Sequence, residues 1–438
     1  MSTADVSSPT ATSEPPSNWR LVAFSSTGFG KSLFWSAADI FCLVFATDTL
    51  GLDPALAGAV VLVTLIWDAV SDPIVGLLVD RFPRLHGTYG LTIMFAGPMT
   101  AIFLSLVFTA QFSEGVWQSV IFVVGLLLFR TAFTFFDIPD NALFCRIARS
   151  DTSRIFGAST RKLMATLAAV AVSISSSWVF SDNADLTEGV RILLASCVIG
   201  IVGSLALILG AATVRRWDKL APVTSLPRWP SLKAIIGNSA VLRLCLHMFF
   251  SSLSMAAFMV CLVYHSRFIL GDGGWFATSM TIFLVGQAVG VVAWGWYAVR
   301  HTAEAGLRLA GSLAVLAAAM FFAAPSAALS IAVCSFFGFC AGGLNTLRWA
   351  IAPAAIEMAK LENGQQNEAA IIAIFTLSIK AAIGFASLVV GGALSLSAYF
   401  PNAVATDSQA TTFMGIVGAV CLTSMFAATM VVVRRSAR

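Results

Sequence analysis

Charged residues are scarce in this chain: Asp, Glu, Lys and Arg make up only 11% of its 438 residues. A soluble globular domain has about 25% charged residues, so this scarcity excludes an ordinary soluble enzyme or binding domain. The net charge of +4 reflects basic residues in the connecting loops, and we expect no nucleic-acid partner.

Cysteine and histidine are few, and both are dispersed. The eight cysteines have no CxxC spacing, which is typical of small apolar packing residues rather than of disulfides or metal ligands. The four histidines do not cluster either, so we predict no metal site. The chain also lacks a Walker motif, a Gly-rich phosphate loop and a nucleophile–base pair, which argues against an ATP-driven pump and against an enzyme.

Apolar residues dominate what is present. They make up 58% of the chain and recur in runs of roughly 20 residues, long enough to cross a bilayer as helices and unlike the short alternating strands of a β-barrel. The predicted fold is an all-α integral membrane protein with twelve transmembrane helices. The spans are expected at about 22–50, 54–79, 89–110, 116–145, 160–181, 189–214, 241–270, 274–299, 304–324, 327–354, 368–397 and 410–433.

The hydrophilic segments divide the chain in two. We predict a disordered cytoplasmic tail at 1–21, a six-helix bundle at 22–214, a basic cytoplasmic linker at 215–240 and a second six-helix bundle at 241–438. Two such bundles joined by a cytoplasmic loop are the layout of the major facilitator superfamily, in which the binding cavity lies between the halves.

Basic residues fall almost entirely on one side of the predicted spans. Arg191 is the only one expected in the opposite loops. The positive-inside rule then predicts that both termini are cytoplasmic. We expect a multi-pass protein of a bacterial inner membrane.

The most informative stretch is LIWDAVSDPIVGLLVDR, from Leu65 to Arg81. Asp68 and Asp72 are spaced i,i+4, so a helix carries both on one face. Each carboxylate at this depth costs roughly 2.5–3.5 kcal/mol on insertion scales, which indicates a cationic partner or ligand nearby. Pro73 removes a helix hydrogen bond and would allow a bend beside the pair.

Two further spans carry buried charge. Arg130, Thr134 and Asp137 share one face of the fourth span, and Lys380 lies inside the eleventh. We interpret the acids and Lys380 as a switch: the ammonium neutralises the carboxylates until Na⁺ or H⁺ displaces it. The alternative is a helix–helix salt bridge without a transport role.

Several motifs resemble the glycoside–pentoside–hexuronide:cation symporter family, to which the melibiose permease belongs. The specific one is WDAxxDPxxG, at Trp67–Gly76. Supporting motifs are GFGKSLF at Gly28–Phe34, TDTLGLDPALAG at Thr47–Gly58, FFDIPDNAL at Phe135–Leu143 and STRKLMATLA at Ser159–Ala168. The second half matches weakly, chiefly around Lys380.

The resemblance implies a set of site residues. The family's cation site maps to Asp68, Asp72, Thr134 and Lys380, and its sugar site maps to Lys31, Asp137 and Arg161. Two positions depart from the family pattern: Ser32 replaces a sugar-binding acid, and Asn141 replaces an aromatic residue that stacks on the sugar. We therefore expect a kept cation site and a rebuilt substrate pocket.

Other charges belong to this rebuilt pocket in our interpretation. Asp39 lies two turns after Ser32 on the same face, and Arg130 is an added cation. With Lys31, Arg161 and Arg348, Arg130 suggests an anionic group on the substrate, such as a uronide. The alternative is that Arg130 simply pairs with Asp137 or Asp39.

The loop DRFPRLHGTYG, at Asp80–Gly90, occupies the gate-loop position of the superfamily. We predict a gating role for Asp80, Arg81 and Arg84, with Asp80 capping the following helix or pairing with a cytoplasmic Arg. The alternative is an ordinary solvated loop.

The resemblance implies a secondary active transporter that performs cation-coupled symport of a sugar-like solute by alternating access. It would need no cofactor beyond coupling Na⁺ or H⁺, and its partners would be a small-molecule substrate and membrane lipid, with the protein acting as a monomer. The alternative is a transporter of lysolipids, other amphiphiles or organic anions with the same fold. A membrane receptor is a third, less favoured class.

Overall fold

The computed structural model describes residues 16–52, 54–86, 89–179, 186–218, 237–268, 275–323, 327–363, 368–397 and 407–432. In the first half the elements are α1 (Asn18–Phe24), α2 (Ser26–Val44), η1 (Phe45–Thr49), α3 (Pro54–His86), α4 (Tyr89–Phe108), η2 (Thr109–Phe112), α5 (Val116–Ile147), α6 (Asp151–Val179), α7 (Glu188–Thr213) and η3 (Arg215–Trp217). In the second half they are α9 (Ser239–Phe268), α10 (Trp275–Arg300), α11 (Ala303–Phe322), α12 (Ala327–Asn363), α13 (Glu368–Leu396) and α14 (Asp407–Met430).

The predicted fold class is confirmed. The described residues contain twelve helical segments that are long and apolar enough to cross a membrane. The first of them joins α1, α2 and η1, so each of the remaining long helices is one span. This is a multi-pass integral membrane protein.

Some helices extend further than their apolar runs. The fifth span was predicted to begin at 160, but α6 begins at Asp151, and the tenth was predicted to end at 354, but α12 continues to Asn363. Hydropathy marks only where a helix meets hydrocarbon, whereas its backbone hydrogen bonds can continue into water. As a result, Arg161 lies well inside a helix.

Helical structure begins inside both the predicted tail and the predicted linker. Helix α1 begins at Asn18, inside the predicted tail, and it buries Leu21 and Phe24. At the linker, η3 occupies the first residues and α9 begins at Ser239. Residues 1–15 and 219–236 lie outside the described residues.

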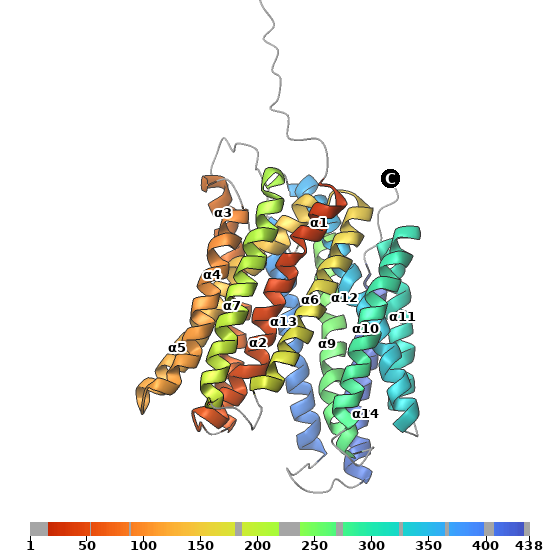
Figure 1. The fold of residues 1–438 in the computed structure, drawn as a ribbon. Helices are drawn as coiled ribbons and strands as arrows, with labels where there is room; N and C mark the ends of the chain where they lie inside the picture. Colours follow the sequence, from red (N-terminus) through yellow and green to blue (C-terminus); the bar gives the residue numbers. More distant parts are fainter. Residues whose placement is uncertain are drawn as a thin grey trace, which may run out of the picture.

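The helices form two groups that lie side by side in Figure 1. Helices α2 and α4 to α7 pack on one another, and so do α9 to α14, while α3 joins the first group through α5. Across the boundary, α3 and α5 pack on α13, and α6 packs on α10 and α12. We call the end of the molecule where α3, α5 and α7 end, and α4, α6 and α9 begin, the linker face; it lies uppermost in Figure 1.

Glycines allow two of the closest helix contacts. A Cβ on Gly30 of α2 would lie 2.5 Å from the carbonyl oxygen of Gly203 on α7, and one on Gly290 of α10 would lie 2.1 Å from that of Phe339 on α12. These backbones can therefore touch directly, as in other membrane helix pairs with small residues at the contact.

Candidate functional site

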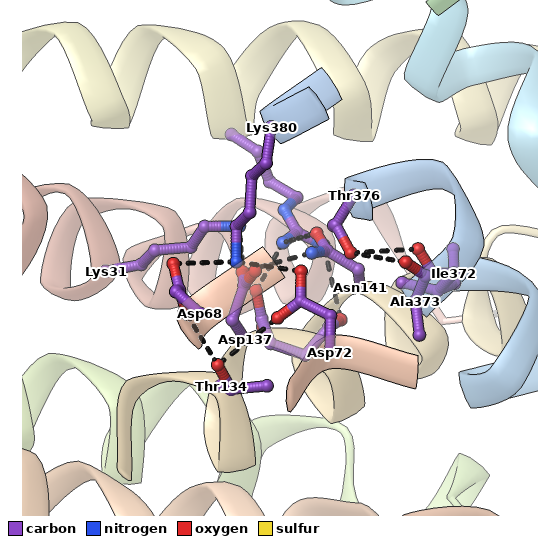
Figure 2. Close-up of polar contacts among 12 residues, drawn as sticks. Lys31, Asp68, Asp72, Thr134, Asp137, Asn141, Ile372, Ala373, Thr376 and Lys380 are labelled. Atoms are coloured by element: carbon purple, nitrogen blue, oxygen red, sulfur yellow. Dashed lines mark hydrogen bonds and ion pairs between the residues drawn. The ribbon is translucent and has the colours of Figure 1, made fainter. Parts of the chain in front are cut away.

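Asp68 and Asp72 lie on one face of α3, as their spacing predicts, and that face points toward α13. Both side chains are fully buried. Lys380 reaches from α13 so that its Nζ lies 2.8 Å from Asp68 Oδ2 and 2.7 Å from Asp72 Oδ2 (Figure 2). The ammonium therefore occupies the space between the two carboxylates, and the ion pairs link the two helix groups.

Thr134 of α5 completes this group. Its Oγ1 lies 2.8 Å from Asp68 Oδ1 and 3.2 Å from Asp72 Oδ1, and the backbone oxygen of Arg130 is a third acceptor at 3.2 Å. The hydroxyl has one proton, so it can donate to only one of these acceptors at a time. Its lone pairs and the carboxylates form the kind of oxygen cluster that a small hard cation needs.

A second polar group adjoins the first. Lys31 of α2 forms an ion pair with Asp137 of α5, and Arg161 of α6 forms one with Asp140 of α5. Asn141 connects the two pairs: its Nδ2 donates to Asp137 Oδ1 at 3.1 Å, and its Oδ1 accepts from Arg161 Nη2 at 3.0 Å. Its amide thus uses both a donor and an acceptor, which no aromatic side chain at this position could do.

A cavity of about 210 Å³ lies beside these pairs, between the two helix groups. Its walls come from α2, α5, α6 and α12. It is lined by Gly28, Lys31, Ser32, Asn141, Phe144, Ala158, Arg161, Lys162, Ala165, Asn345, Arg348 and Trp349. None of these residues is acidic. Asp137 and Asp140, which pair with Lys31 and Arg161, therefore do not line the cavity themselves.

The structure thus brings four of the predicted substrate residues to the cavity: Lys31, Ser32, Asn141 and Arg161. Asp137 does not line the cavity, but it contacts two of the lining residues: it pairs with Lys31 and accepts a hydrogen bond from Asn141.

The structure does not bring Asp39 and Arg130 to the cavity. Arg130 is only 3% exposed, and its guanidinium carbon lies 4.8 Å from the centre of the Trp35 ring. Among the described residues it forms no ion pair with Asp137 or Asp39, which was the alternative to a substrate role, although its charge acts on the Asp39 carboxyl. The sequence analysis did not predict its cation–π contact with Trp35. This contact depends on which face of α2 packs against α5, and the sequence of either helix alone does not show that.

Lys162, Asn345 and Trp349 are lining residues that the sequence analysis missed, and Arg348 was named only as a further cation. The signal for Lys162 was its place directly after Arg161 in the STRKLMATLA motif. With the span starting at 160, both appeared to lie at the membrane edge. The earlier start of α6 moves them into the helix interior.

Asp80 contacts the other helix group rather than the partners predicted for it. Its carboxylate accepts hydrogen bonds from the backbone N–H groups of Ala369 and Ala370, at 3.1 and 2.9 Å, and from the Tyr89 hydroxyl at 2.6 Å. It therefore caps the start of α13 instead of α4, and among the side chains that the structure describes it forms no ion pair with an Arg. The expected cap of the following helix was wrong, because an N-terminus distant in the sequence offered unpaired N–H donors and a positive helix dipole.

Arg146 extends these contacts across the linker face. Its guanidinium contacts Glu368 of α13 at 2.5 Å and Asp218 at 2.9 Å, and it stacks on the Tyr89 ring. Asp218 follows η3, and its other oxygen accepts from the backbone N–H of Gly90 at 2.6 Å. Burial raises the pKa of the Asp218 carboxyl to about 6, although Arg146 opposes this change.

A second ion pair joins the groups at this end. Arg154 of α6 contacts Glu357 of α12 at 2.8 Å. Together with the Asp80 and Arg146 contacts, it joins the two helix groups at the linker face. The side chains of Arg81 and Arg84, which we predicted to act in gating, lie outside the part of the structure that is described.

Comparisons with known proteins agree with this architecture. The family model described as MFS/sugar transport protein matches residues 23–435. A putative glycoside/cation symporter of Escherichia coli strain K12 is 23% identical over 83% of this chain and 80% of its own length. A sodium-dependent lysophosphatidylcholine symporter of Danio rerio is 23% identical over 87% of this chain and 78% of its own.

A solved structure shares the fold. A bacterial homologue of the iron transporter ferroportin, in its outward-facing state, superposes with a TM-score of 0.72 at 13% identity, covering 94% of this chain and 98% of that one. At this identity the likeness concerns the fold alone.

Proposed function

Because the chain belongs to the family of MFS/sugar transport proteins, we propose that it is a secondary transporter that couples Na⁺ or H⁺ to the movement of a sugar-like solute. The proposal depends on one observation above the others. Lys380 of one helix group lies between Asp68 and Asp72 of the other.

This geometry supplies a coupling mechanism. Two carboxylates and one ammonium leave a net negative charge, which a small cation can neutralise. When Na⁺ binds the carboxylate oxygens, or a proton binds one of them, the attraction of Lys380 weakens. The ion pairs between the helix groups are then exchanged for contacts inside one group, so cation binding changes how firmly the groups are joined.

The cavity favours a small polar solute. Its lining is rich in charged and amide groups, and its volume of about 210 Å³ lies below the roughly 300–1,000 Å³ of pockets for drug-sized ligands. The glycoside/cation symporter of E. coli supports the same class of substrate. The relative named as a lysophosphatidylcholine symporter is the observation that favours our second candidate, transport of a lysolipid.

Alternating access would require the two halves, 22–214 and 241–438, to move as units about this cavity. The contacts at the linker face would form the closed gate on one side. We propose that this face is cytoplasmic, since it carries Arg146, Arg154 and Arg216 together with most other basic residues. The protein would act as a monomer in a bacterial inner membrane.

The proposal is tested by uptake of radiolabelled glycosides and uronides into proteoliposomes with an imposed Na⁺ or H⁺ gradient. We expect gradient-driven accumulation by the wild type. Lys380→Ala should reduce it to the level of empty liposomes, because the carboxylates lose the partner that the cation displaces. Arg308→Ala is the control, since Arg308 is an exposed cation of α11 away from the contacts between the helix groups.

Undiminished accumulation by Lys380→Ala would contradict the coupling mechanism. Gradient-driven uptake of a lysolipid, with no uptake of any sugar, would select the second candidate.

A further inference from the structure

The cavity carries more positive charge than its surroundings neutralise. Lys31 and Arg161 are each paired with an acid, Asp137 and Asp140. Lys162 and Arg348 also line the cavity, but neither forms an ion pair with any described residue. Two cationic side chains therefore face one small cavity without counter-ions.

Arg348 of α12 is held only by neutral groups. Its Nη1 donates to Ser252 Oγ at 2.8 Å, and its Nη2 donates to Asn345 Oδ1 at 2.7 Å. Its Nε has no partner, although the residue is only 7% exposed. A buried guanidinium with unused donors and no acid nearby costs free energy unless a ligand supplies the negative charge.

Lys162 faces the same cavity from α6, in the other helix group. The charges of Arg348 and Lys31 are close enough to repel its ammonium. The like charges of Lys162 and Arg348 therefore repel each other between α6 and α12. An anion between them would replace this repulsion with attraction to both helices.

We propose that Lys162 and Arg348 form an oxyanion subsite, which selects a small polyol that carries a carboxylate or sulfonate group. The proposal rests on the proposed function and names the substrate class of the same cavity. Arg348 would offer its planar guanidinium to two oxygens, and Lys162 would act as a point charge from the opposite side. The polyol hydroxyls would lie toward Asn141 and the paired Lys31 and Arg161.

The subsite would also make cavity closure depend on substrate charge. An anion that contacts residues of both helix groups draws α6 and α12 together, whereas a neutral sugar leaves the repulsion in place. The cation site has the opposite charge, with two carboxylates against one ammonium. The two sites would thus bind a cation and an anion side by side.

The test compares methyl glucuronide with methyl glucoside, which differ only in the C6 group, and with the C6-sulfonate analogue of the glucoside. Binding is measured by isothermal titration calorimetry on purified protein, and uptake is measured in proteoliposomes. Lysophosphatidylcholine is the fourth probe, since its phosphate is also an oxyanion. We expect the two anionic sugars to bind roughly 10- to 100-fold more tightly than the glucoside.

The variants are Lys162→Gln and Arg348→Gln, with Arg308→Gln, an exposed arginine of α11, as control. Each subsite variant should lose roughly 10- to 100-fold in affinity for the anionic sugars and little for the glucoside. Removing one of two repelling charges should also raise the melting temperature of ligand-free Lys162→Gln. Arg348→Lys keeps the charge and provides a second variant in case Arg348→Gln folds poorly.

Equal affinity for glucuronide and glucoside in the wild type would overturn the subsite, and so would an equal loss for both sugars in Lys162→Gln. Loss of lysophosphatidylcholine uptake in the variants, without any binding of the sugar acids, would overturn the small-polyol assignment. Tight glucuronide binding without gradient-driven uptake would support the subsite and contradict the coupled transport. Gradient-driven accumulation of the glucoside, without a preference for the glucuronide, would support the coupled transport and contradict the subsite.

Discussion

Asn141 shows how one residue can change the character of a substrate pocket. The family resemblance places an aromatic residue there, but the amide of Asn141 instead joins the Lys31–Asp137 pair to the Arg161–Asp140 pair. A stacking surface for a sugar ring is replaced by a hydrogen-bonded link among charges. This link keeps four charged side chains in one arrangement, and it leaves Lys162 and Arg348 as the cations open to a ligand.

Thr134 provides a residue-scale test of the identity of the coupling ion. Thr134→Val keeps the shape of the side chain but removes the hydroxyl near Asp68 and Asp72. Sodium needs several oxygen ligands, so the variant should lower the apparent Na⁺ affinity by roughly 10- to 100-fold. A proton needs one carboxylate only, so H⁺-driven uptake should change little.

The measurement is solute uptake against Na⁺ concentration at fixed pH, and against a pH gradient without Na⁺. Thr134→Ser restores the hydroxyl and should behave as the wild type does. A Na⁺ dependence that is the same in Thr134→Val and in the wild type would remove Thr134 from the cation site.

At the scale of elements, the contact of α3 with α13 joins the cation site to the linker face. Asp68 and Asp72 contact Lys380 near the middle of α13, and Asp80, on the same helix α3, caps the start of α13. Gly76 lies between these two points, where a Cβ would meet Ala373 Cβ at 2.7 Å and the Ala369 oxygen at 2.8 Å. Any change in the cation site therefore acts on the same helix pair that closes the linker face.

Gly76→Val should open this closed end. The added side chain meets backbone and methyl groups that cannot rotate away, so α3 and α13 must separate. Cys145 lies next to Arg146 at the linker face, and its reaction with a maleimide should become severalfold faster. The rate is measured by mass spectrometry of the Cys145 peptide.

Gly384→Val is the matched control, because a Cβ on Gly384 of α13 has no neighbour within 4 Å among the described residues. It should leave the Cys145 rate unchanged. Equal rates in Gly76→Val and in the wild type would mean that the contact at Gly76 does not hold this end closed.

At the scale of the whole molecule, the structure combines ion pairs at the linker face with an ammonium between Asp68 and Asp72. The ion pairs of Arg146 and Arg154 join the two helix groups at one end, and those of Lys380 join them near the cavity. A transporter needs such contacts to be strong enough to close one side and weak enough to exchange. The buried ion pairs of Arg146 and Lys380 meet this need, because the cost of desolvation offsets much of their attraction. Glu357 is exposed, so its pair with Arg154 is weakened by solvent instead.

Asp218 makes the stability of this arrangement depend on pH. Burial raises the pKa of its carboxyl from an ordinary 3.8 to about 6, so the folded protein holds this proton at a higher pH than the unfolded chain. The contribution of Asp218 to the free energy of unfolding therefore declines as pH rises from about 4 to 6, by on the order of 2–3 kcal/mol. The groups facing it are Arg146, Glu368 and the backbone N–H groups of Tyr89 and Gly90.

The check is the melting temperature of purified protein between pH 4 and 7.5. Relative to Asp218→Asn, the wild type should lose stability as pH rises through this window. Glu114→Gln, at an exposed position away from the linker face, should follow the wild type. A constant difference between the wild type and Asp218→Asn would show that the Asp218 carboxyl does not titrate in this range.

The sequence by itself determined the features that depend on local pattern. Hydropathy predicted twelve spans, and the i,i+4 spacing of Asp68 and Asp72 placed both carboxylates on one helix face. The scarcity of charge inside the spans made each buried charge noticeable, which is why Lys380 was already matched with the acids of α3. Helix periodicity and the cost of charge in hydrocarbon are properties of a single segment. They can therefore be predicted from the sequence of that segment alone.

Only the tertiary structure decided which partner each side chain has. Asp80 was expected near its own loop and caps α13. Arg130 was expected in the substrate pocket, with an acid as its alternative partner, and it stacks on Trp35. Lys162 and Arg348, from different halves of the chain, line one cavity. Such pairings depend on how helices pack and how far each extends, which the sequence of a single helix does not contain.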